Sequence, residues 1–259
     1  MDLNNLFRDR KVLIFGVANE RSIGWGIAQA FHALGAKIGF TYVGEALERR
    51  VRPLAESLGS DLILPCDVTD DAQIKAVFDE VQEKWGGLDV LVHSVAFANR
   101  EDLEGRFVDT SRDGFLLALN ISAYSLVTLT KHAMPLLSQS KGSVVTLSYY
   151  GAEKVVPNYN VMGVAKAALE ASVRYLAADC GPEGVRVNAI SAGPVKTLAS
   201  AGIKGFKGML GFAGEKAPLR RNITLEEVAG AAVFLCSELG GGVTGETLYV
   251  DSGYNIMGM

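Results

Sequence analysis

Two tyrosines and a lysine between residues 147 and 166 are the side chains whose types and spacing best suit chemistry. Tyr159 and Lys166 are seven residues apart, and seven helical steps of about 100° return to nearly the same face, roughly 10 Å along the axis. Tyr149 follows an apolar run and can face the same space. Since a phenol beside an ammonium group can deliver a proton next to a bound cofactor, this stretch predicts a catalytic site.

A strand and a helix must position these side chains. Residues 143–147 form an apolar run that predicts a buried strand. Asn158 is expected to cap the following helix, which places Tyr159 in its first turn. Small residues such as Gly163 and Ala165 leave the pair uncovered. A tyrosine and a lysine at this spacing also occur by chance, so the pair indicates catalysis only together with a nucleotide site elsewhere in the chain.

Composition limits the classes of function. The 259 residues, 49% of them hydrophobic, can bury the core of one α/β domain. A net charge of −4 without a long basic run argues against a nucleic-acid partner. No apolar segment is expected to approach the about 20 residues of a membrane span, and the first residues contain no apolar signal core. We therefore expect a cytoplasmic protein with no membrane partner.

The cysteines and histidines predict neither disulfides nor a metal site. Cys66, Cys180 and Cys236 lack any paired spacing, which is typical of proteins in a reducing cytosol. The histidines that we expect to be structural, because none has the spacing of metal ligands, are His32, His93 and His132.

A strand-to-helix turn near the N-terminus has the features of a dinucleotide site. Residues 11–15 predict a buried parallel strand that ends at Gly16. A glycine permits a tight turn there, and the positive end of the following helix attracts a pyrophosphate. The spacing differs from the G-x-G-x-x-G fingerprint, so a turn that binds no ligand remains an alternative.

The next two strands bear on the adenosine half of such a cofactor. Residues 38–42 carry no acid that would hold a ribose hydroxyl, and no lysine or arginine follows immediately to hold a ribose phosphate. This favours NADH weakly and leaves NADPH as an alternative. Asp67, after a strand at residues 61–65, is placed to accept a hydrogen bond from the adenine amine. Its alternative role is to cap the next helix, although Thr69 and Asp70 are better placed for it.

Seven strands alternating with helices predict one domain over residues 1–259, a Rossmann-type, doubly wound parallel sheet with helices on both faces. The other expected helices span about 45–58, 71–85, 110–137 and 225–239, and the remaining strands 88–94, 184–191 and 247–250. Glycine-rich residues 198–221 are expected to form a mobile apolar lid over a substrate. Ligands of such sheets bind beyond the carboxyl ends of the strands. The strand-end residues expected to meet there are Gly16, Ser94, Tyr149 and Val195.

These residues together resemble the short-chain dehydrogenase/reductase superfamily over essentially the whole chain, and more closely its bacterial enoyl-acyl-carrier-protein reductases. The features that carry the resemblance are Gly16 followed by Ser22-Ile23, Tyr149, the Tyr159-x6-Lys166 spacing and Arg186-Val-Asn-Ala-Ile-Ser-Ala-Gly-Pro194. The wider superfamily places its tyrosine four residues before the lysine, where this chain has Met162. Because a thioether cannot donate a proton, the ketone-reductase assignment fails at its central residue.

The resemblance implies that NADH reduces the trans-2 double bond of enoyl thioesters in type II fatty acid elongation, in a homotetramer whose substrate is presented by an acidic acyl carrier protein. It implies that Tyr159 contacts the enolate oxygen, Lys166 holds the nicotinamide ribose, and Tyr149 and the backbone of Ala98 shape the substrate pocket. The residues that it matches to cofactor contacts are Gly16, Ser22, Ile23, Val43, Asp67, Val68, Ser94, Val95, Lys166, Val195, Thr197, Leu198 and Ala199.

The shifted tyrosine has a physical reason. In conjugate reduction the hydride adds to the β-carbon, and negative charge develops on a thioester oxygen two carbons away. Moving the tyrosine back by three residues adds about 4.5 Å of helical rise, which is the right order for this displacement. Helices at 110–137 and 158–180 could supply the tetramer interface. Candidate basic residues for docking the carrier protein, unless they are simply solvated, are Lys204, Lys207, Arg220 and Arg221.

Two other functions stay open at this point. A short-chain ketone or alcohol dehydrogenase would share the fold, and Met162 counts against it. A dinucleotide-sensing protein without catalysis would also share the fold, but it need not retain both Tyr159 and Lys166. The sequence does not determine the preferred acyl chain length or which tyrosine donates the proton.

Overall fold

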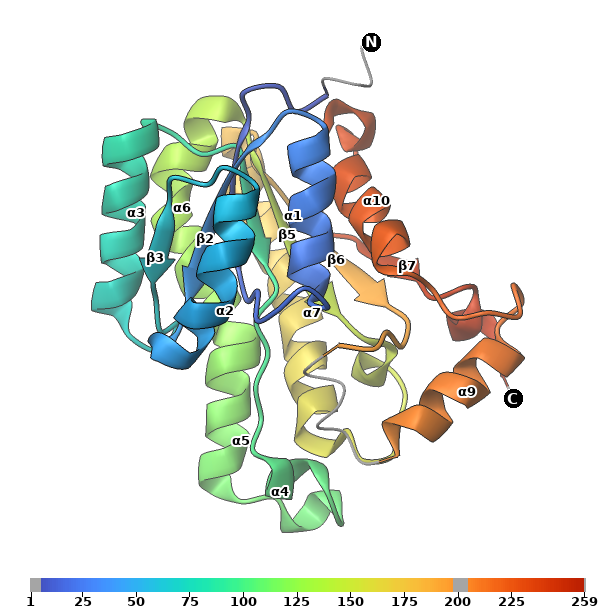
Figure 1. The fold of residues 1–259 in the computed structure, drawn as a ribbon. Helices are drawn as coiled ribbons and strands as arrows, with labels where there is room; N and C mark the ends of the chain where they lie inside the picture. The colour runs from blue at the N-terminus through green and yellow to red at the C-terminus, as the bar shows by residue number, and fades with distance from the viewer. Residues whose placement is uncertain (1–5, 198–204, 259) are drawn as a thin grey trace.

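In the computed structural model, which describes residues 6–197 and 205–258, seven parallel strands form one sheet in the order β3-β2-β1-β4-β5-β6-β7 (Figure 1). The strands are β1 Lys11–Phe15, β2 Lys37–Tyr42, β3 Ile63–Pro65, β4 Val90–His93, β5 Ser143–Ser148, β6 Arg186–Ala192 and β7 Thr247–Val250. The chain winds outward from β1 to β3 and then crosses back to β4 on the other side of β1. The predicted doubly wound sheet is confirmed, and its order reverses between β1 and β4.

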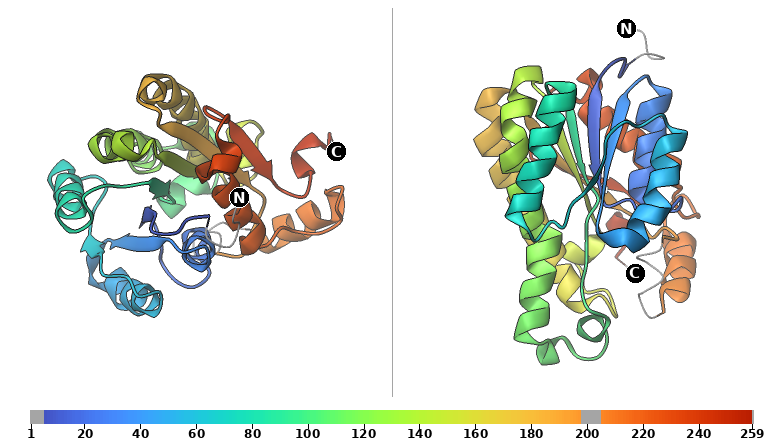
Figure 2. Two further views of the ribbon diagram at one scale, coloured as in Figure 1. Left: turned by 90° about the horizontal axis from the view of Figure 1, so that it is seen from above. Right: turned by 60° about the vertical axis from the view of Figure 1, so that its left-hand side comes forward.

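Helices cover both faces of this sheet (Figure 2). On one face lie α1 Ile23–Ala33, α2 Gly44–Ser57 and α10 Leu225–Cys236. On the other lie α3 Asp71–Trp85, α6 Ser125–Ser140 and α7 Asn160–Cys180. Three further helices lie beyond the carboxyl ends of the strands: α4 Arg100–Leu103, α5 Arg112–Leu119 and α9 Phe206–Lys216 (Figure 1). The site is therefore enclosed between the sheet edge and this lower group of helices.

The strand sequences explain why they lie in the middle of the molecule. In β1, Leu13 and Phe15 pack into the core beneath α3 and α6, while Val12 and Ile14 pack into the core beneath α1 and α10. All four are at most 1% exposed. A strand buried on both faces needs a continuous apolar run instead of an alternating one, and this is the pattern from which the strand was predicted.

The start of α7 differs from the prediction. The helix begins at Asn160, and Tyr159 occupies the N-cap position with φ −109° and ψ −30°. Asn158 does not cap the helix, because its backbone has φ +60°, in the left-handed region that asparagine tolerates. The helix therefore begins one residue later than predicted.

The glycine-rich segment after β6 is more ordered than predicted. Residues 206–216 form helix α9, so the expectation of a segment without a packed element is wrong there, while residues 198–204 lie outside the described part. Phe206, Met209 and Ala213 recur at helical spacing on the partly or fully buried side. A side chain added at Gly208 or Gly211 would meet nothing within 4 Å. These glycines lie on the open face of the helix, where they break no contact.

One helical stretch meets the length and composition criteria for a membrane span, contrary to the sequence-based expectation. Arg112–Ser140 is 29 residues long with a best-window mean hydropathy of 1.2. Half of that window is buried inside the fold, and a buried core helix passes the same test. The stretch comprises α5, the π-helical turn Asn120–Tyr124 and α6. Its serines and threonines interrupt the apolar run, which is why the sequence scan missed it.

A partly buried arginine connects the end of α10 to the sheet. Arg186, the first residue of β6, donates a hydrogen bond of 2.8 Å to Ser143 Oγ on β5. Its guanidinium also donates to backbone carbonyls at and after the end of α10, those of Leu235, Ser237, Gly240 and Val243. Buried carbonyl groups need such donors, and this one side chain supplies four of them.

We predict that Arg186→Met lowers the free energy of unfolding by about 3 kcal/mol, because several buried carbonyls lose a charged donor at once. Urea denaturation followed by circular dichroism measures this change. The control is Arg49→Met on α2, whose ion pair with Glu45 at 3.5 Å is exposed and should leave the urea midpoint unchanged. Equal midpoints for the two variants would contradict the interpretation.

Candidate functional site

A cavity of about 820 Å³ opens at the carboxyl ends of the strands, where the strand order reverses. Its wall includes the ends of β1, β2, β4, β5 and β6, and Phe206 and Met209 of α9 close it from below. Open α/β sheets bind ligands at this position.

The predicted site residues that the structure describes all line this cavity. They are Gly16, Ser22, Ile23, Val43, Asp67, Val68, Ser94, Val95, Ala98, Tyr149, Tyr159, Lys166, Val195 and Thr197. Leu198 and Ala199 lie outside the described residues. The predicted convergence of strand ends is thus observed, while the role of each residue stays a prediction.

Gly16 lines the cavity where the end of β1 lies against Ser94, the residue after β4. Its backbone has φ +96°, and a Cβ there would lie 2.0 Å from the carbonyl oxygen of Ser94. Only glycine combines this left-handed backbone with so close an approach. The absence of a side chain lets the ends of β1 and β4 meet and leaves space for a ligand backbone beside them.

The loop from β1 to α1 is folded by Ser22. This buried hydroxyl accepts hydrogen bonds from the N–H groups of Ala18 at 3.0 Å and Asn19 at 3.1 Å. At the N-cap position of α1, the Ser22 side chain makes no capping hydrogen bond to the first turn of the helix. The positive end of the helix is therefore available to an anion in the cavity that Ser22 and Ile23 line.

The residues predicted to face an adenosine, Val43 and Asp67, lie at the cavity. Val43, half exposed, follows β2 without an acid beside it. Asp67 lines the cavity, and its Oδ1 accepts hydrogen bonds from the backbone N–H of Thr69 at 2.9 Å and from Thr69 Oγ1 at 2.7 Å. Asp70 caps α3 by accepting from two backbone N–H groups. The helix-capping alternative for Asp67 is therefore wrong, and its carboxylate is held at the cavity wall by Thr69.

The two tyrosines lie edge to face, with ring centroids 5.1 Å apart. Burial raises the pKa of Tyr149 to about 12, and burial together with nearby acidic groups raises the pKa of Tyr159 further from its ordinary value. Both phenols consequently remain protonated at neutral pH and can donate hydrogen bonds. Tyr149 donates one, of 3.2 Å, to Met209 Sδ on α9.

Lys166 is a buried cation, only 5% exposed. Its Nζ donates a hydrogen bond of 2.6 Å to the carbonyl oxygen of Leu147 on β5. Burial lowers the pKa of Lys166 to about 8, so the ammonium form still predominates at neutral pH. Met162, four residues earlier, packs against Tyr159 and Ala165 and also lines the cavity. A thioether therefore occupies the helix position where ketone reductases carry their tyrosine.

This geometry can be compared with known proteins. A family model described as enoyl-(acyl carrier protein) reductase matches residues 16–255. The chain belongs to this family. The resemblance drawn from Gly16, Tyr149 and the Tyr159-x6-Lys166 spacing is confirmed.

Curated relatives in the family match almost end to end. The enoyl-[acyl-carrier-protein] reductase [NADH] of Rickettsia typhi is 57% identical over 253 residues, which cover 98% of this chain and 97% of the relative. That of Bacillus cereus is 54% identical, covering 98% and 99%.

Solved structures of the family share the fold. The Bacillus cereus reductase with NADP+ and an indole naphthyridinone is 54% identical, with a TM-score of 0.96 and coverage of 98% of this chain and 99% of that one. The Anaplasma phagocytophilum reductase in complex with NAD is also 54% identical, with a TM-score of 0.94 and coverage of 98% and 97%.

The histidine nearest the site is structural, as expected. His93 is completely buried, with Nδ1 2.7 Å from Thr146 Oγ1 and Nε2 2.7 Å from Ser125 Oγ. Burial lowers its pKa to about 3, so the ring stays neutral. Within residues 6–197 and 205–258, no cluster of three acidic, cysteine or histidine side chains could hold a metal ion. The three cysteines are free and buried.

Three apolar residues that line the cavity, Phe97, Leu103 and Ile121, were not predicted from the sequence, whereas Phe206 and Met209 lie in the predicted apolar lid. The helical spacing of Phe206, Met209 and Ala213 was a usable signal for the α9 pair. The other three have no local signal, because the fold brings them together from separate elements.

We predict that Gly16→Ala weakens NADH binding at least about tenfold and lowers the melting temperature, because a Cβ cannot fit beside Ser94. Protein fluorescence titration and thermal melting measure the two effects. Gly59→Ala is the matched control, since Gly59 has φ +68° but no atom within 4 Å of an added Cβ. It should lose about 1 kcal/mol of stability from backbone strain alone and bind NADH normally. Equal behaviour of both variants would contradict the close-approach argument.

Proposed function

We propose that this chain is an NADH-dependent enoyl-[acyl-carrier-protein] reductase that reduces the trans-2 double bond of enoyl thioesters during fatty acid elongation. The observation that carries the proposal is the pair of Tyr159 and Lys166 in a dinucleotide-type cavity, with Met162 at the helix position that ketone reduction requires for a phenol. Membership of the family and the names of the relatives support the same activity.

The residues at the cofactor end fit a nicotinamide dinucleotide. A pyrophosphate would lie in the cavity beside Gly16, where the start of α1, which the Ser22 side chain does not cap, would offer it N–H groups. Asp67 would accept a hydrogen bond from the adenine amine. The segment Val195–Thr197 would contact the amide group of the nicotinamide. Relatives with NAD and with NADP+ support NADH as the ordinary cofactor and NADPH as a second one.

The residues at the reacting end would act on charge that develops in the substrate. NADH, when bound, supplies the hydride that adds to C3 of the enoyl thioester. Tyr159 would donate a hydrogen bond to the thioester oxygen as it becomes an enolate, in a buried site where such a bond is strong. Its raised pKa keeps the phenol protonated for this task. Tyr149 would shape the pocket and support the orientation of Tyr159 through their ring contact.

Lys166 would hold the nicotinamide ribose hydroxyls and stabilise the developing anion by its charge. One N–H of its Nζ donates a hydrogen bond to the carbonyl oxygen of Leu147. An ammonium group has three donors in all, so two remain to reach into the cavity. This makes Lys166 a positioning cation for both the cofactor and the oxyanion.

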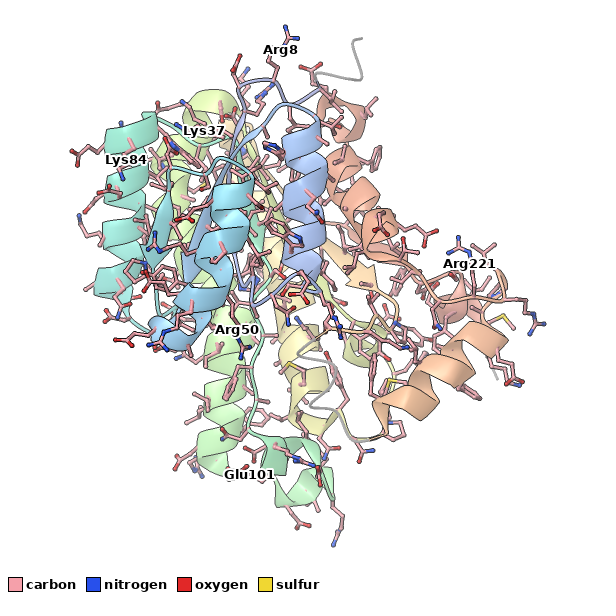
Figure 3. The ribbon with its side chains drawn as sticks, viewed as in Figure 1. Arg8, Lys37, Arg50, Lys84, Glu101 and Arg221 are labelled. Atoms are coloured by element: carbon pink, nitrogen blue, oxygen red, sulfur yellow. The ribbon has the colours of Figure 1, made fainter. Side chains whose placement is uncertain are left out.

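An acyl carrier protein would present the substrate, and the active form would be a cytoplasmic homotetramer. Exposed apolar side chains on and beside the proposed interface helices, Leu116, Tyr124 and Tyr175, support the oligomer. Among the candidate docking residues, Lys204 and the side chain of Lys207 lie outside the described part. Arg221, at the outer edge of the molecule (Figure 3), is paired with Glu227 by contacts of 2.9 and 2.6 Å. Arg220 is therefore the better candidate of the two arginines.

The activity test is the loss of nicotinamide absorbance on mixing the protein with NADH and a short trans-2-enoyl thioester. We expect turnover of this substrate and none of a ketone supplied with NADH or NADPH. Turnover of the ketone alone would overturn the proposal in favour of a short-chain dehydrogenase. NADH binding with no turnover of either substrate would favour the sensing protein.

Tyr159→Phe is expected to lower kcat about a hundredfold, because the oxyanion loses its donor, while the KM for NADH stays unchanged. Tyr149→Phe should lower kcat much less, since its hydroxyl bonds Met209 in the resting site. Steady-state kinetics of both variants measure the difference. A Tyr159→Phe variant with undiminished kcat would exclude the proposed oxyanion contact.

A further inference from the structure

A buried carboxylate, Glu170, lies one helical turn after Lys166 on α7. Glu170 is 8% exposed and Lys166 is 5% exposed. Four residues apart in a helix, they share one face. An acidic side chain is rarely buried unless a partner compensates its charge. The reaction described above assigns Glu170 no role, so its burial next to the site calls for one.

The end of β5 holds both members of this pair. Leu147 accepts the hydrogen bond from Lys166 Nζ through its carbonyl oxygen. The next residue, Ser148, lines the cavity and donates a short hydrogen bond from Oγ to Glu170 Oε1. Two consecutive strand residues therefore hold the buried ammonium group and the buried carboxylate of one α7 face against the end of β5.

We propose that Glu170 is a positioning residue that acts as the counter-ion of Lys166 and keeps it an ammonium group, ready to bind the nicotinamide ribose. This rests on the proposed function only in naming the ribose as the group that Lys166 binds. The charge relation between Glu170 and Lys166 belongs to the protein without any ligand.

The electrostatics of the site support this role. Taking an ammonium group out of water disfavours its charged form, and burial is the larger influence on Lys166. Glu170 acts in the opposite direction, raising the pKa of Lys166 through its negative charge. Burial raises the pKa of Glu170, while the hydrogen bond from Ser148 lowers it. Ser148 thus helps the carboxylate to stay ionised, and the ionised carboxylate helps Lys166.

Other titratable and charged groups surround the pair. His93 on β4 faces Lys166, and burial lowers its pKa to about 3. Tyr149, which follows β5 and lines the same cavity as Lys166, has its pKa raised to about 12 by burial. The groups that face Glu170 are Arg174 on its own helix, Glu153 after the turn Tyr150–Ala152, Tyr159, and Tyr249 on β7. Burial raises the pKa of Tyr159 and Tyr249 as well. Among the groups here whose pKa is shifted by burial, Lys166, at about 8, is the one expected to lose its charge on mildly alkaline titration.

Glu170→Gln tests the proposal, because glutamine keeps the shape and can still accept from Ser148 but carries no charge. Protein labelled with ¹³C at lysine Cε is titrated by NMR without nucleotide, with Lys166→Arg used to assign the resonance. We expect the pKa of Lys166 to fall by about one unit. The loss of NADH affinity at alkaline pH, followed by fluorescence, should move to lower pH by the same amount.

Glu153→Gln is the matched control. It removes a more exposed carboxylate that faces Glu170 and accepts a hydrogen bond from Tyr249, and it should leave the Lys166 titration in place. Glu170→Asp keeps the charge and should hold the pKa of Lys166 within about half a unit of its wild-type value. This variant decides the matter if the glutamine variant does not fold, since a fall of a full unit would then overturn the proposal.

A folded Glu170→Gln protein whose Lys166 titrates as in the wild type would also overturn it, and Glu170 would then only support the packing of α7 against β5. The NMR titration needs neither NADH nor an enoyl thioester. If Glu170→Gln lowers the pKa of Lys166 as expected but the wild-type protein does not reduce enoyl thioesters, only the proposed function is refuted. If the wild-type protein reduces enoyl thioesters but Glu170→Gln leaves the pKa of Lys166 unchanged, only the inference about Glu170 is refuted.

Discussion

The close approach of β1 and β4 at Gly16 is the constraint on which the rest of the site depends. The carbonyl of Ser94 lies where a Cβ of residue 16 would be. Because this contact sets the carboxyl ends of the two adjacent parallel strands against each other, it also fixes where α1 begins and where the segment Ser94–Ala98 leaves the sheet. Every later element of the site, from Tyr149 to Thr197, is placed against this edge by parallel strand pairing. The cavity is therefore a consequence of strand order before any catalytic side chain is considered.

Burial then shifts the pKa values of the side chains proposed to take part in the reaction. The same desolvation acts on two phenols and one ammonium group, and it favours the neutral form of each. For Tyr149 and Tyr159 the neutral form is the hydrogen-bond donor that an oxyanion needs. For Lys166 the neutral amine would lack the positive charge that the proposed mechanism requires. A nearby carboxylate is therefore needed to favour the ammonium form. The enclosed site that strengthens the tyrosines as donors thus creates the requirement that Glu170 meets.

Much of the fold could be predicted because its elements are marked locally. The strands Lys11–Phe15 and Thr247–Val250 and the helix Asp71–Trp85 have the predicted bounds, since short apolar runs and a helical pattern lie between turn residues there. The errors occur where tertiary context overrides local preference. Asn158 looks like a helix cap but adopts a left-handed backbone, and Gly208 and Gly211 of α9 look like loop residues but lie on its open face. A helix was predicted at 110–137, but that Arg112–Ser140 meets the criteria for a membrane span was not expected, because polar residues interrupt its apolar run.

The candidate site was predictable wherever a residue stands at a strand end or repeats at helical spacing, as Gly16, Ser94, Tyr159 and Lys166 do. It was not predictable where a side chain's role depends on a neighbour distant in the sequence. In the sequence, Glu170 looks like one more charged residue of a helix, and Ser148 looks like the end of a strand. Only the packing of α7 on β5 turns this helix face inward and joins the two across 22 positions. The role of a buried charged side chain is thus inferred from the group that it contacts, and that group is known only once the fold is known.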